Sequence, residues 1–584
     1  MKKRVSLLLG ILMLFLLILP AQAQVPEQHA AGQAFGAMYA QDIRGNIQAL
    51  YQAAEEKAVD KAALTEHALG SAEACAELLP GKIDWMRGVA DGAGIPYADI
   101  AVFNFSDKLV GGLYGECTTF MANGKYVAGG GTIIAKNRDQ SIQTLSEVTL
   151  EEAARYTKDD LYQAAYIQIP QMEETYRFTG SRTAGRWGYG MGVNEHGVSA
   201  SDNDANSRDY LQFDKSLHDN DVIRLILERA KTAREGVDVV ASLVEEYGQA
   251  WNGIMFEIGD KDELWIVEVT GKRWAAKLYK DAYTARSNQF QLRDDYDLAS
   301  PDLISFAAEM GWEEAGAEKI DFTAAYSSRE LYPSSNDDIA TRESCASLYN
   351  TQVRYDRAME LLEEALAIDG TISPRDMTAF VRDHFDTYTL PSGKVVDMQQ
   401  IPFYSSDLCD WYGREWYVDT PGKDTIEVSI YLRAPCSHDL GWGATSATGI
   451  LVTQPDVPGM MLHSYMPPCM GTFVPFFPLQ TQVDERYSTP EAASVYNTIA
   501  TKSFGFYSLF YDGVREAFDP YENSMFQSLE NVTNQYQALV KAGEKEAAAQ
   551  LLTAFSMAQQ AAAYEASQQA LQNMQDAAVE NSSW

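Results

Sequence analysis

The stretch from residue 117 to residue 140 constrains the fold most strongly, because it has the pattern of two antiparallel strands. Cys117 to Ala122 and Lys125 to Asn137 are largely apolar, and Asn123-Gly124 between them is the strongest two-residue signal for a hairpin turn. Residues 27 to about 80, in contrast, are rich in Ala, Glu, Gln and Lys and poor in β-branched residues, which predicts helices. The sequence therefore predicts a helical segment ahead of a sheet that begins at a cysteine.

Strands and helices alternate in groups along the rest of the chain. We predict a glycine-rich turn at residues 92–94, a second hairpin at Trp187–Ser201, two helices in Asp221–Gly248 and strands around two turns in 253–279. Helices follow at about Thr351–Ala367 and after the cap Ser373, and further strands at 424–436, 447–455 and 459–467. This grouping favours a layered α+β fold over a doubly wound parallel sheet.

Both ends of the chain differ from its centre. Residues 1–23 have a basic start, an apolar run to Pro20 and the small residues Ala21 and Ala23, the pattern of a secretory signal. The apolar run is too short for a spanning helix, so no membrane anchor is expected. Residues 521–584 have helical spacing interrupted at Gly543, which predicts a helical hairpin packed on the body, or else a free coiled-coil arm.

The net charge of −36 disfavours binding to nucleic acid and to anionic membranes. Together with the signal, it indicates a secreted or periplasmic protein. Six cysteines in 584 residues are too few for a disulfide scaffold. Cys409, Cys436 and Cys469 are the candidates for pairing among themselves, and Cys436-Ser437-His438 is a weak metal signal.

Cys117 is the candidate nucleophile, and the question is what base would activate it. None of the seven histidines has a spacing that marks a cysteine protease, and no HExxH or paired-cysteine metal motif is present. An N-terminal nucleophile uses its own α-amine as the base once the chain is cut in front of it. An α-amine titrates near about 7.7–8.0 and a thiol near about 8.5, so the two are well matched at neutral pH.

Several motifs carry a family resemblance. "ECTTF" followed by "GGGTIIAKNRD" resembles the start of the mature chain in N-terminal nucleophile hydrolases such as the secreted dipeptidase family. "RGVADGAGIPYADIAVFN" resembles the propeptide of the acyl-coenzyme A:6-aminopenicillanate acyltransferase family. "GVNEHGVSAS", "ARSNQF", "YNTQVRYDRAMELLEE" and "APCSHDLGWGATSATGILV" follow in the order seen in those families and in choloylglycine hydrolases. The resemblance covers roughly residues 85 to 480.

The resemblance implies a four-layer αββα sandwich over residues 117–520, with residues 24–116 as a helical propeptide that is cut before Cys117 and retained. It assigns Cys117 as nucleophile and Asp139 as the carboxylate that holds the new amine. Asn288 would donate its amide to the oxyanion, with a second donor from backbone near Asn203.

The other residues that match family motifs carry charged side chains. Lys136 stands where many relatives have arginine, and Arg354 would brace the site, with Arg357 as a competitor. Glu116 precedes the bond to be cut, where many relatives have glycine.

The expected activity is hydrolysis, or acyl transfer, of a linear amide or peptide bond through a thioester, with no cofactor and no metal ion. The expected partner is a small amide or short peptide, and self-association through the C-terminal helices is a further expectation. Three alternatives stay open: a lipid amide or ester hydrolase, a non-catalytic exported binding protein in which Cys117 is a buried hydrophobe, and an interaction module built on the tail.

Overall fold

A computed structural model describes most of the chain and leaves several segments outside the description. The described residues are 27–56, 60–78, 80–105, 117–140, 145–209, 211, 215–250, 253–314, 316–328, 346–384, 387–389, 395–397, 434–439, 443–484, 487, 495–496, 498–500, 502 and 507–580. The expected signal at 1–23, Cys345, Cys409 and most of the strand expected at 424–436 lie outside them. Among the described residues, no helix combines the length and apolar character needed to cross a membrane.

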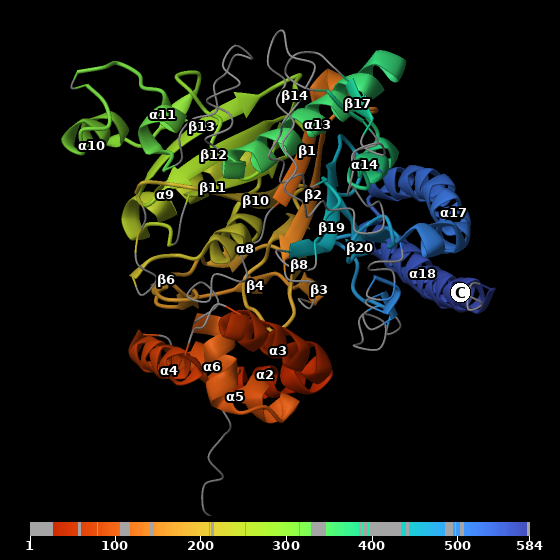
Figure 1. The fold of residues 1–584 in the computed structure, drawn as a ribbon, viewed down its shortest axis with the longest axis horizontal. Helices are drawn as coiled ribbons and strands as arrows, with labels where there is room; N and C mark the ends of the chain where they lie inside the picture. Colours follow the sequence, from red (N-terminus) through yellow and green to blue (C-terminus); the bar gives the residue numbers. More distant parts are fainter. Residues whose placement is uncertain are drawn as a thin grey trace, which may run out of the picture.

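The N-terminal segment folds into a helical unit with a core of its own (Figure 1). Glycines allow two of its helices to touch, since a Cβ on Gly32 would lie 2.0 Å from the Trp85 carbonyl oxygen and one on Gly92 2.0 Å from that of Gln33. Gly92 is therefore a helix contact, and the predicted turn at 92–94 is confined to Gly94, which has φ +61°. The helices are α2 (Glu27–Met38), α3 (Ala40–Glu56), α4 (Lys61–Leu78), α5 (Pro80–Ala93) and α6 (Tyr97–Phe105).

Two antiparallel sheets form the centre of the molecule. The first has the order β14 (Tyr283–Arg286), β1 (Cys117–Asn123), β2 (Thr132–Gln140), β19 (Gly443–Thr453), β20 (Met460–Tyr465) and β21 (Val474–Phe476), with β18 (His438–Asp439) also beside β19. The second has the order β15 (Leu298–Ala299), β13 (Arg273–Tyr279), β12 (Leu264–Thr270), β11 (Gly253–Gly259), β10 (Ser199–Ala205), β9 (Met191–Asn194), β8 (Phe178–Thr183) and β3 (Ser146–Glu151).

The sheets stack face to face between two layers of helices, which confirms the predicted αββα architecture (Figure 1). Ile134 of the first sheet and Met191 and Ile266 of the second belong to one buried apolar cluster. The second sheet is covered by α8 (Asp219–Arg229) and α9 (Ala233–Tyr247), and the first by α13 (Ala346–Asp369) and α14 (Pro374–Phe380). Burying apolar side chains on both inner faces is what holds such sheets about 10 Å apart.

Smaller elements complete the described part of the chain. They are α10 (Leu303–Glu309), α11 (Phe322–Tyr326) and the strand pairs β4 (Ala154–Arg155) with β7 (Glu174–Thr175), β5 (Leu161–Gln163) with β6 (Gln168–Pro170), and β16 (Thr387–Thr389) with β17 (Val395–Asp397).

The hairpin that begins at Cys117 forms, but its turn is longer than predicted. A short 3-10 helix at Gly124–Tyr126 follows β1, and β2 begins only at Thr132 rather than at Lys125. Gly129, Gly130 and Gly131 intervene, all with positive φ, and a Cβ on Gly131 would lie 2.2 Å from the Thr453 carbonyl oxygen. The glycine run thus lets the connection fold tightly against the end of β19.

The C-terminal hairpin packs on the body and is not a free arm. Its helices are α17 (Tyr507–Ala542) and α18 (Lys545–Glu580), so the first begins ahead of the predicted boundary at residue 521. Ser556 of α18 donates to the Pro475 carbonyl of β21 at 2.6 Å, and Tyr521 of α17 to the Phe473 carbonyl at 3.2 Å.

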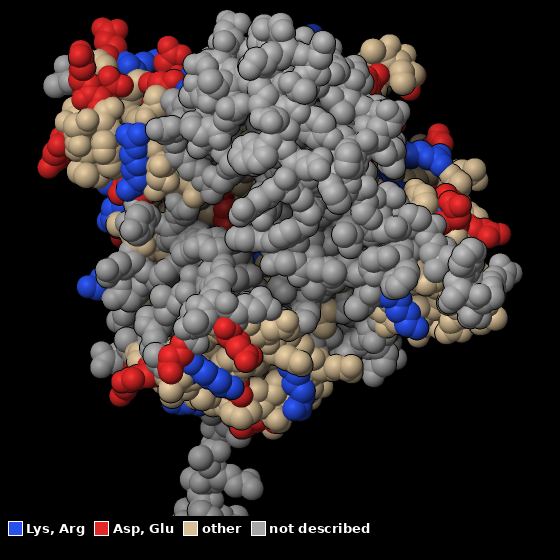
Figure 2. Space-filling view, viewed as in Figure 1, with Lys and Arg blue, Asp and Glu red and all other residues tan. Residues whose placement is uncertain are grey.

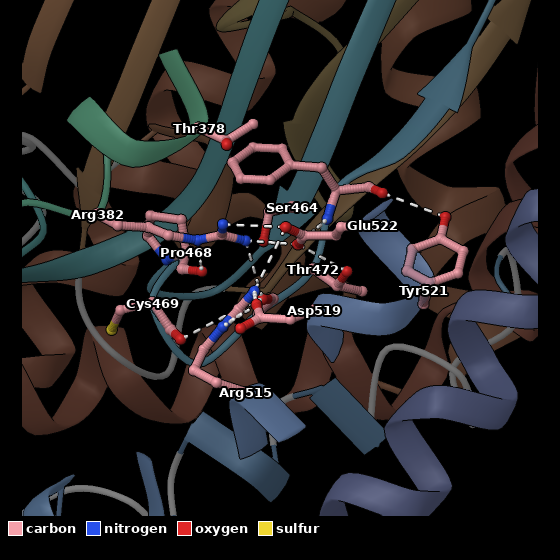
Figure 3. Close-up of polar contacts among 12 residues, drawn as sticks. Thr378, Arg382, Ser464, Pro468, Cys469, Thr472, Arg515, Asp519, Tyr521 and Glu522 are labelled. Carbon is pink, nitrogen blue, oxygen red and sulfur yellow. Dashed lines mark hydrogen bonds and ion pairs between the residues drawn. The ribbon is translucent and has the colours of Figure 1, made fainter. Parts of the chain in front are cut away.

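A buried ionic group joins α17 to the loop between β20 and β21 (Figure 3). Glu522 accepts from Arg382 at 2.5 and 3.0 Å, pairs with Arg515 at 3.3 Å and accepts from Thr472 at 2.9 Å. Burial works to raise the pKa of Glu522, but Arg382 and Arg515 outweigh it, so the pKa lies below its ordinary value. The carboxylate therefore stays charged between two buried cations.

We expect Glu522→Gln to destabilise the protein by about 3 kcal/mol or more, because Arg382 and Arg515 lose the negative charge that is buried between them. Urea unfolding would measure the loss. A depressed folded pKa means that the contribution of Glu522 is full above the unfolded value of about 4.3 and is lost as the pH falls through the lower folded value. The gap between wild type and variant should therefore close in acid.

Asp519→Asn is the matched control, since Asp519 also pairs with Arg515 but its side chain is 57% exposed. It should cost less than about 1 kcal/mol. An equal loss of unfolding free energy in the two variants would show that the buried carboxylate of Glu522 stabilises the protein no more than the exposed one of Asp519.

Candidate active site

Cys117 is the first residue of β1, in the interior of the first sheet, with β14 on one side and β2 on the other. It lies opposite Arg138 of β2 in the strand register and is only 7% exposed. Its side chain is a free thiol. The position brings the backbone of Cys117 within reach of side chains from β10, from α13 and from the segment that follows β14.

Asn288 and Arg354 hold the two backbone polar groups of Cys117. The Cys117 N–H donates to Asn288 Oδ1 at 2.9 Å, and Arg354 donates through Nη1 to the Cys117 carbonyl at 2.7 Å and through Nη2 to Asn288 Oδ1 at 2.9 Å. Two donors meeting at one amide atom identify that atom as the oxygen. Arg354 also donates to Thr118 Oγ1 at 3.0 Å and is completely buried.

Asn203 of β10 reaches the same carbonyl from the opposite sheet. Its Nδ2 donates to the carbonyls of Cys117 at 3.3 Å and Ser287 at 3.1 Å, and its Oδ1 accepts from Thr119 at 2.7 Å. Every polar atom of the Asn203 side chain is therefore used to join β10 to the start of β1.

Charged side chains on β2 and β10 lie close enough to the Cys117 thiol to change its pKa. Lys136 donates to the Gly190 carbonyl at 3.2 Å and pairs with Asp202, and both side chains are buried. Burial works to lower the pKa of Lys136, but Asp202, Cys117 and Glu257 raise it, so the ammonium stays charged. Asp139 is fully buried and accepts from Thr445 Oγ1 at 2.7 Å.

The thiol is neutral at physiological pH. Burial raises the pKa of Cys117 to about 12; Lys136 opposes the shift, whereas Asp139, Asp202 and Asp204 add to it. Cys117 therefore needs a proton acceptor at the moment of reaction. It forms no hydrogen bond with any of the five histidines whose side chains are described, His29, His196, His218, His384 and His463.

The structure brings together all six residues that the sequence singled out, with two differences in detail. Asn288 was expected to donate to an oxyanion, but its Nδ2 donates to the Asp204 carbonyl at 3.0 Å and its oxygen faces the Cys117 nitrogen. These contacts fit orientation of the amine. Near Asn203, the expected donor was the backbone, whereas the side chain makes the contact with Cys117.

Arg354 and Arg357 are now distinguished. Arg357 pairs with Asp383 at 2.7 Å and with Glu360 at 2.7 Å, and its described contacts do not include Cys117. One helical turn separates the two positions, so spacing alone could not choose between them.

Sequence reasoning missed Asp202 and Thr445, the partners of Lys136 and Asp139. The local run "SDNDA" gave a signal for Asp202, because three polar side chains in the interior of a buried strand need partners. Thr445 lies 306 residues from Asp139, and no local pattern points to it.

Arg354→Ala should expose the start of β1. The substitution leaves the Cys117 carbonyl, Thr118 Oγ1 and Asn288 Oδ1 without this buried donor, so we expect a loss of about 3 kcal/mol in unfolding free energy and alkylation of Cys117 about tenfold faster or more. Peptide mass spectrometry after timed exposure to iodoacetamide would measure the rate. Arg357→Ala, the matched control, should leave the alkylation rate of Cys117 within about twofold; an equal acceleration would contradict the assignment.

The sequence of this chain is similar to those of known proteins. Residues 116–400 match peptidase family C69. A protein of Latilactobacillus sakei named "Probable dipeptidase" is 31% identical over 202 residues, 32% of this chain and 42% of that protein. Another of that name, from Salmonella dublin, is 29% identical over 235 residues, 36% of this chain and 53% of that protein. The chain thus spans about half the length of the curated relatives it matches.

Among solved structures, penicillin V acylase from Agrobacterium tumefaciens is 12% identical, with 62% of this chain and 86% of that chain covered and a TM-score of 0.26. A superposition this loose adds nothing to the assignment. Over residues 116–400 the chain is thus similar to peptidase family C69, and it is similar to two proteins named dipeptidase over part of their length.

Proposed function

We propose that the protein is an exported, self-processing hydrolase of short peptides, in which Cys117 becomes the N-terminal residue and attacks a linear amide bond. The observation that carries the proposal is the convergence of Asn288, Arg354 and Asn203 on the backbone nitrogen and carbonyl of Cys117. A cysteine that only filled the core would not need three side chains on its own main-chain atoms.

The α-amine liberated at Cys117 is the base that this site requires. With the ordinary amine pKa near about 7.7–8.0, it is largely unprotonated just above neutral pH. Asn288 Oδ1 accepts one amine hydrogen, which leaves the lone pair available to the thiol. Lys136 then stabilises the thiolate, since it is the cation that lowers the Cys117 pKa against the effect of burial.

The chemistry proceeds in two steps. The sulfur bonds to the substrate carbonyl carbon, the carbon–nitrogen bond breaks, and the proton held by the α-amine moves to the leaving nitrogen. Water then attacks the thioester with the amine again acting as base, which releases the acid and restores the thiol. Asp139 ties β2 to β19, and Arg354 ties α13 to β1, through both steps.

Short peptides are the proposed substrates because two relatives carry the name dipeptidase. Export rests on the signal pattern at residues 1–23 and on the net charge of −36. On the face shown in Figure 2, basic and acidic side chains of the described residues are interspersed, which supports a small-molecule rather than a nucleic-acid partner. Self-association through α17 and α18 is a further proposal, which sedimentation of the full chain would test.

Processing can be read directly from the purified protein. We expect N-terminal sequencing of the wild type to give two starts, near Gln24 and at Cys117, and Cys117→Ala to stay a single chain because the nucleophile for cleavage is gone. Folding of both is compared by circular dichroism. An uncut wild type that still hydrolyses its substrate would refute the amine-as-base mechanism.

A substrate panel separates the peptide proposal from the lipid alternative. Dipeptides, N-acyl amino acids, long-chain N-acyl amides and the matching esters are offered to wild type and to Cys117→Ala. We expect the highest kcat/KM with dipeptides, and at least about a hundredfold loss for the variant. A preference for the long-chain amide or ester would instead identify a lipid hydrolase on the same scaffold.

A further inference from the structure

Three side chains that can bind a metal ion meet beside the first sheet, and the described hydrogen bonds of Cys117 involve none of them. His384 follows α14, Cys436 precedes β18, and Cys469 lies in the loop between β20 and β21. One ligand atom from each lies within 4.8 Å of the other two. Both cysteines are buried, at 0% and 1% exposure. The group is assembled from segments that are distant in sequence, so it is a product of the fold.

We propose that His384, Cys436 and Cys469 bind one zinc-type divalent cation. Zinc in proteins takes thiolate and imidazole ligands at about 2.3 and 2.0–2.1 Å, in tetrahedral geometry. Donor atoms around such an ion lie about 3.5–4 Å apart, a spacing that the 4.8 Å limit of this group accommodates. Three protein ligands leave one coordination position for water.

The backbone beside the two cysteines is fixed by contacts that do not involve the three ligand atoms. The Cys436 N–H donates to the Asp383 carbonyl at 3.2 Å, and Arg382 donates to the Pro468 carbonyl at 2.8 Å. Arg515 donates to the Cys469 carbonyl at 3.5 Å, and Figure 3 shows this residue and Arg382 converging on the loop. A site held in this way needs little rearrangement to bind an ion.

A Cys436–Cys469 disulfide is the competing outcome, since the sequence marked both as candidates for pairing in an exported protein. The third member of the group favours the metal. A disulfide makes no use of an imidazole, whereas an ion needs a third donor close to both sulfurs, and His384 supplies one within 4.8 Å of each.

The proposed ion would brace β2 from outside the catalytic centre. Asn137 of β2 donates to the Val381 carbonyl at 2.8 Å and to the Pro435 carbonyl at 2.6 Å, and these residues lie close in sequence to His384 and Cys436. Lys136 precedes Asn137 on the same strand. The inference holds whatever the substrate of Cys117.

The test measures metal in the full chain, purified without chelator. We expect about one zinc per chain by mass spectrometry, and a thiolate-to-cobalt absorption band after zinc is exchanged for Co²⁺. Cys436→Ser and Cys469→Ser should lose both signals, and His384→Ala should raise the zinc concentration for half-saturation about tenfold or more. Cys117→Ser, also a buried cysteine, is the matched control and should keep both.

The wild-type spectrum decides the matter even if a variant fails to fold. Absence of zinc together with no cobalt band at saturating Co²⁺ would overturn the proposal. Non-reducing peptide mapping that finds Cys436 linked to Cys469 would overturn it as well, in favour of the disulfide.

Discussion

The buried guanidinium of Arg354 is the interaction on which the region around Cys117 depends. It lies on a helix of the outer layer, yet its hydrogen bonds end on the first residue of a central strand and on the residue that follows a neighbouring strand. A buried cation with this many directed donors fixes both position and rotation, which an apolar contact cannot do. Asn288 and Asn203 complete the arrangement from the two sheets, so three layers of the sandwich meet at one cysteine.

The electrostatics of the site explain why a cysteine here would need its own amine. Burial makes the thiol a weak acid, and three nearby aspartates strengthen that effect, while Lys136, which opposes it, is paired with Asp202. Lowering the thiol pKa is therefore not the route to reactivity in this fold. Under the proposed mechanism, a base that appears only after the chain is cut would keep the thiol unreactive until then.

Local patterns were enough to predict the layered fold and most of its elements, because alternation and capping are properties of neighbouring residues. The helix start at Ser373 and Pro374 is an example, and its capping box is present. What local patterns could not show are contacts between layers. The local pattern predicts a turn at Gly92, because the helix that this glycine contacts at Gln33 lies far away in sequence. Likewise, the motif Cys436-Ser437-His438 suggests that Cys436 and His438 would bind a metal ion together, whereas the fold places Cys436 beside His384 and Cys469. The catalytic roles of Cys117 and its neighbours stay predictions.

The position of α18 against β21 has a consequence for biosynthesis. β21 is an outer strand of its sheet, and α18, which contacts it, follows every other described element in sequence. An uncovered outer strand offers unpaired backbone groups to any extended segment nearby. Until α18 has been synthesised, the nascent protein carries this exposed strand edge, and truncation ahead of Lys545 would yield aggregation-prone material even though every residue that contacts Cys117 is already present.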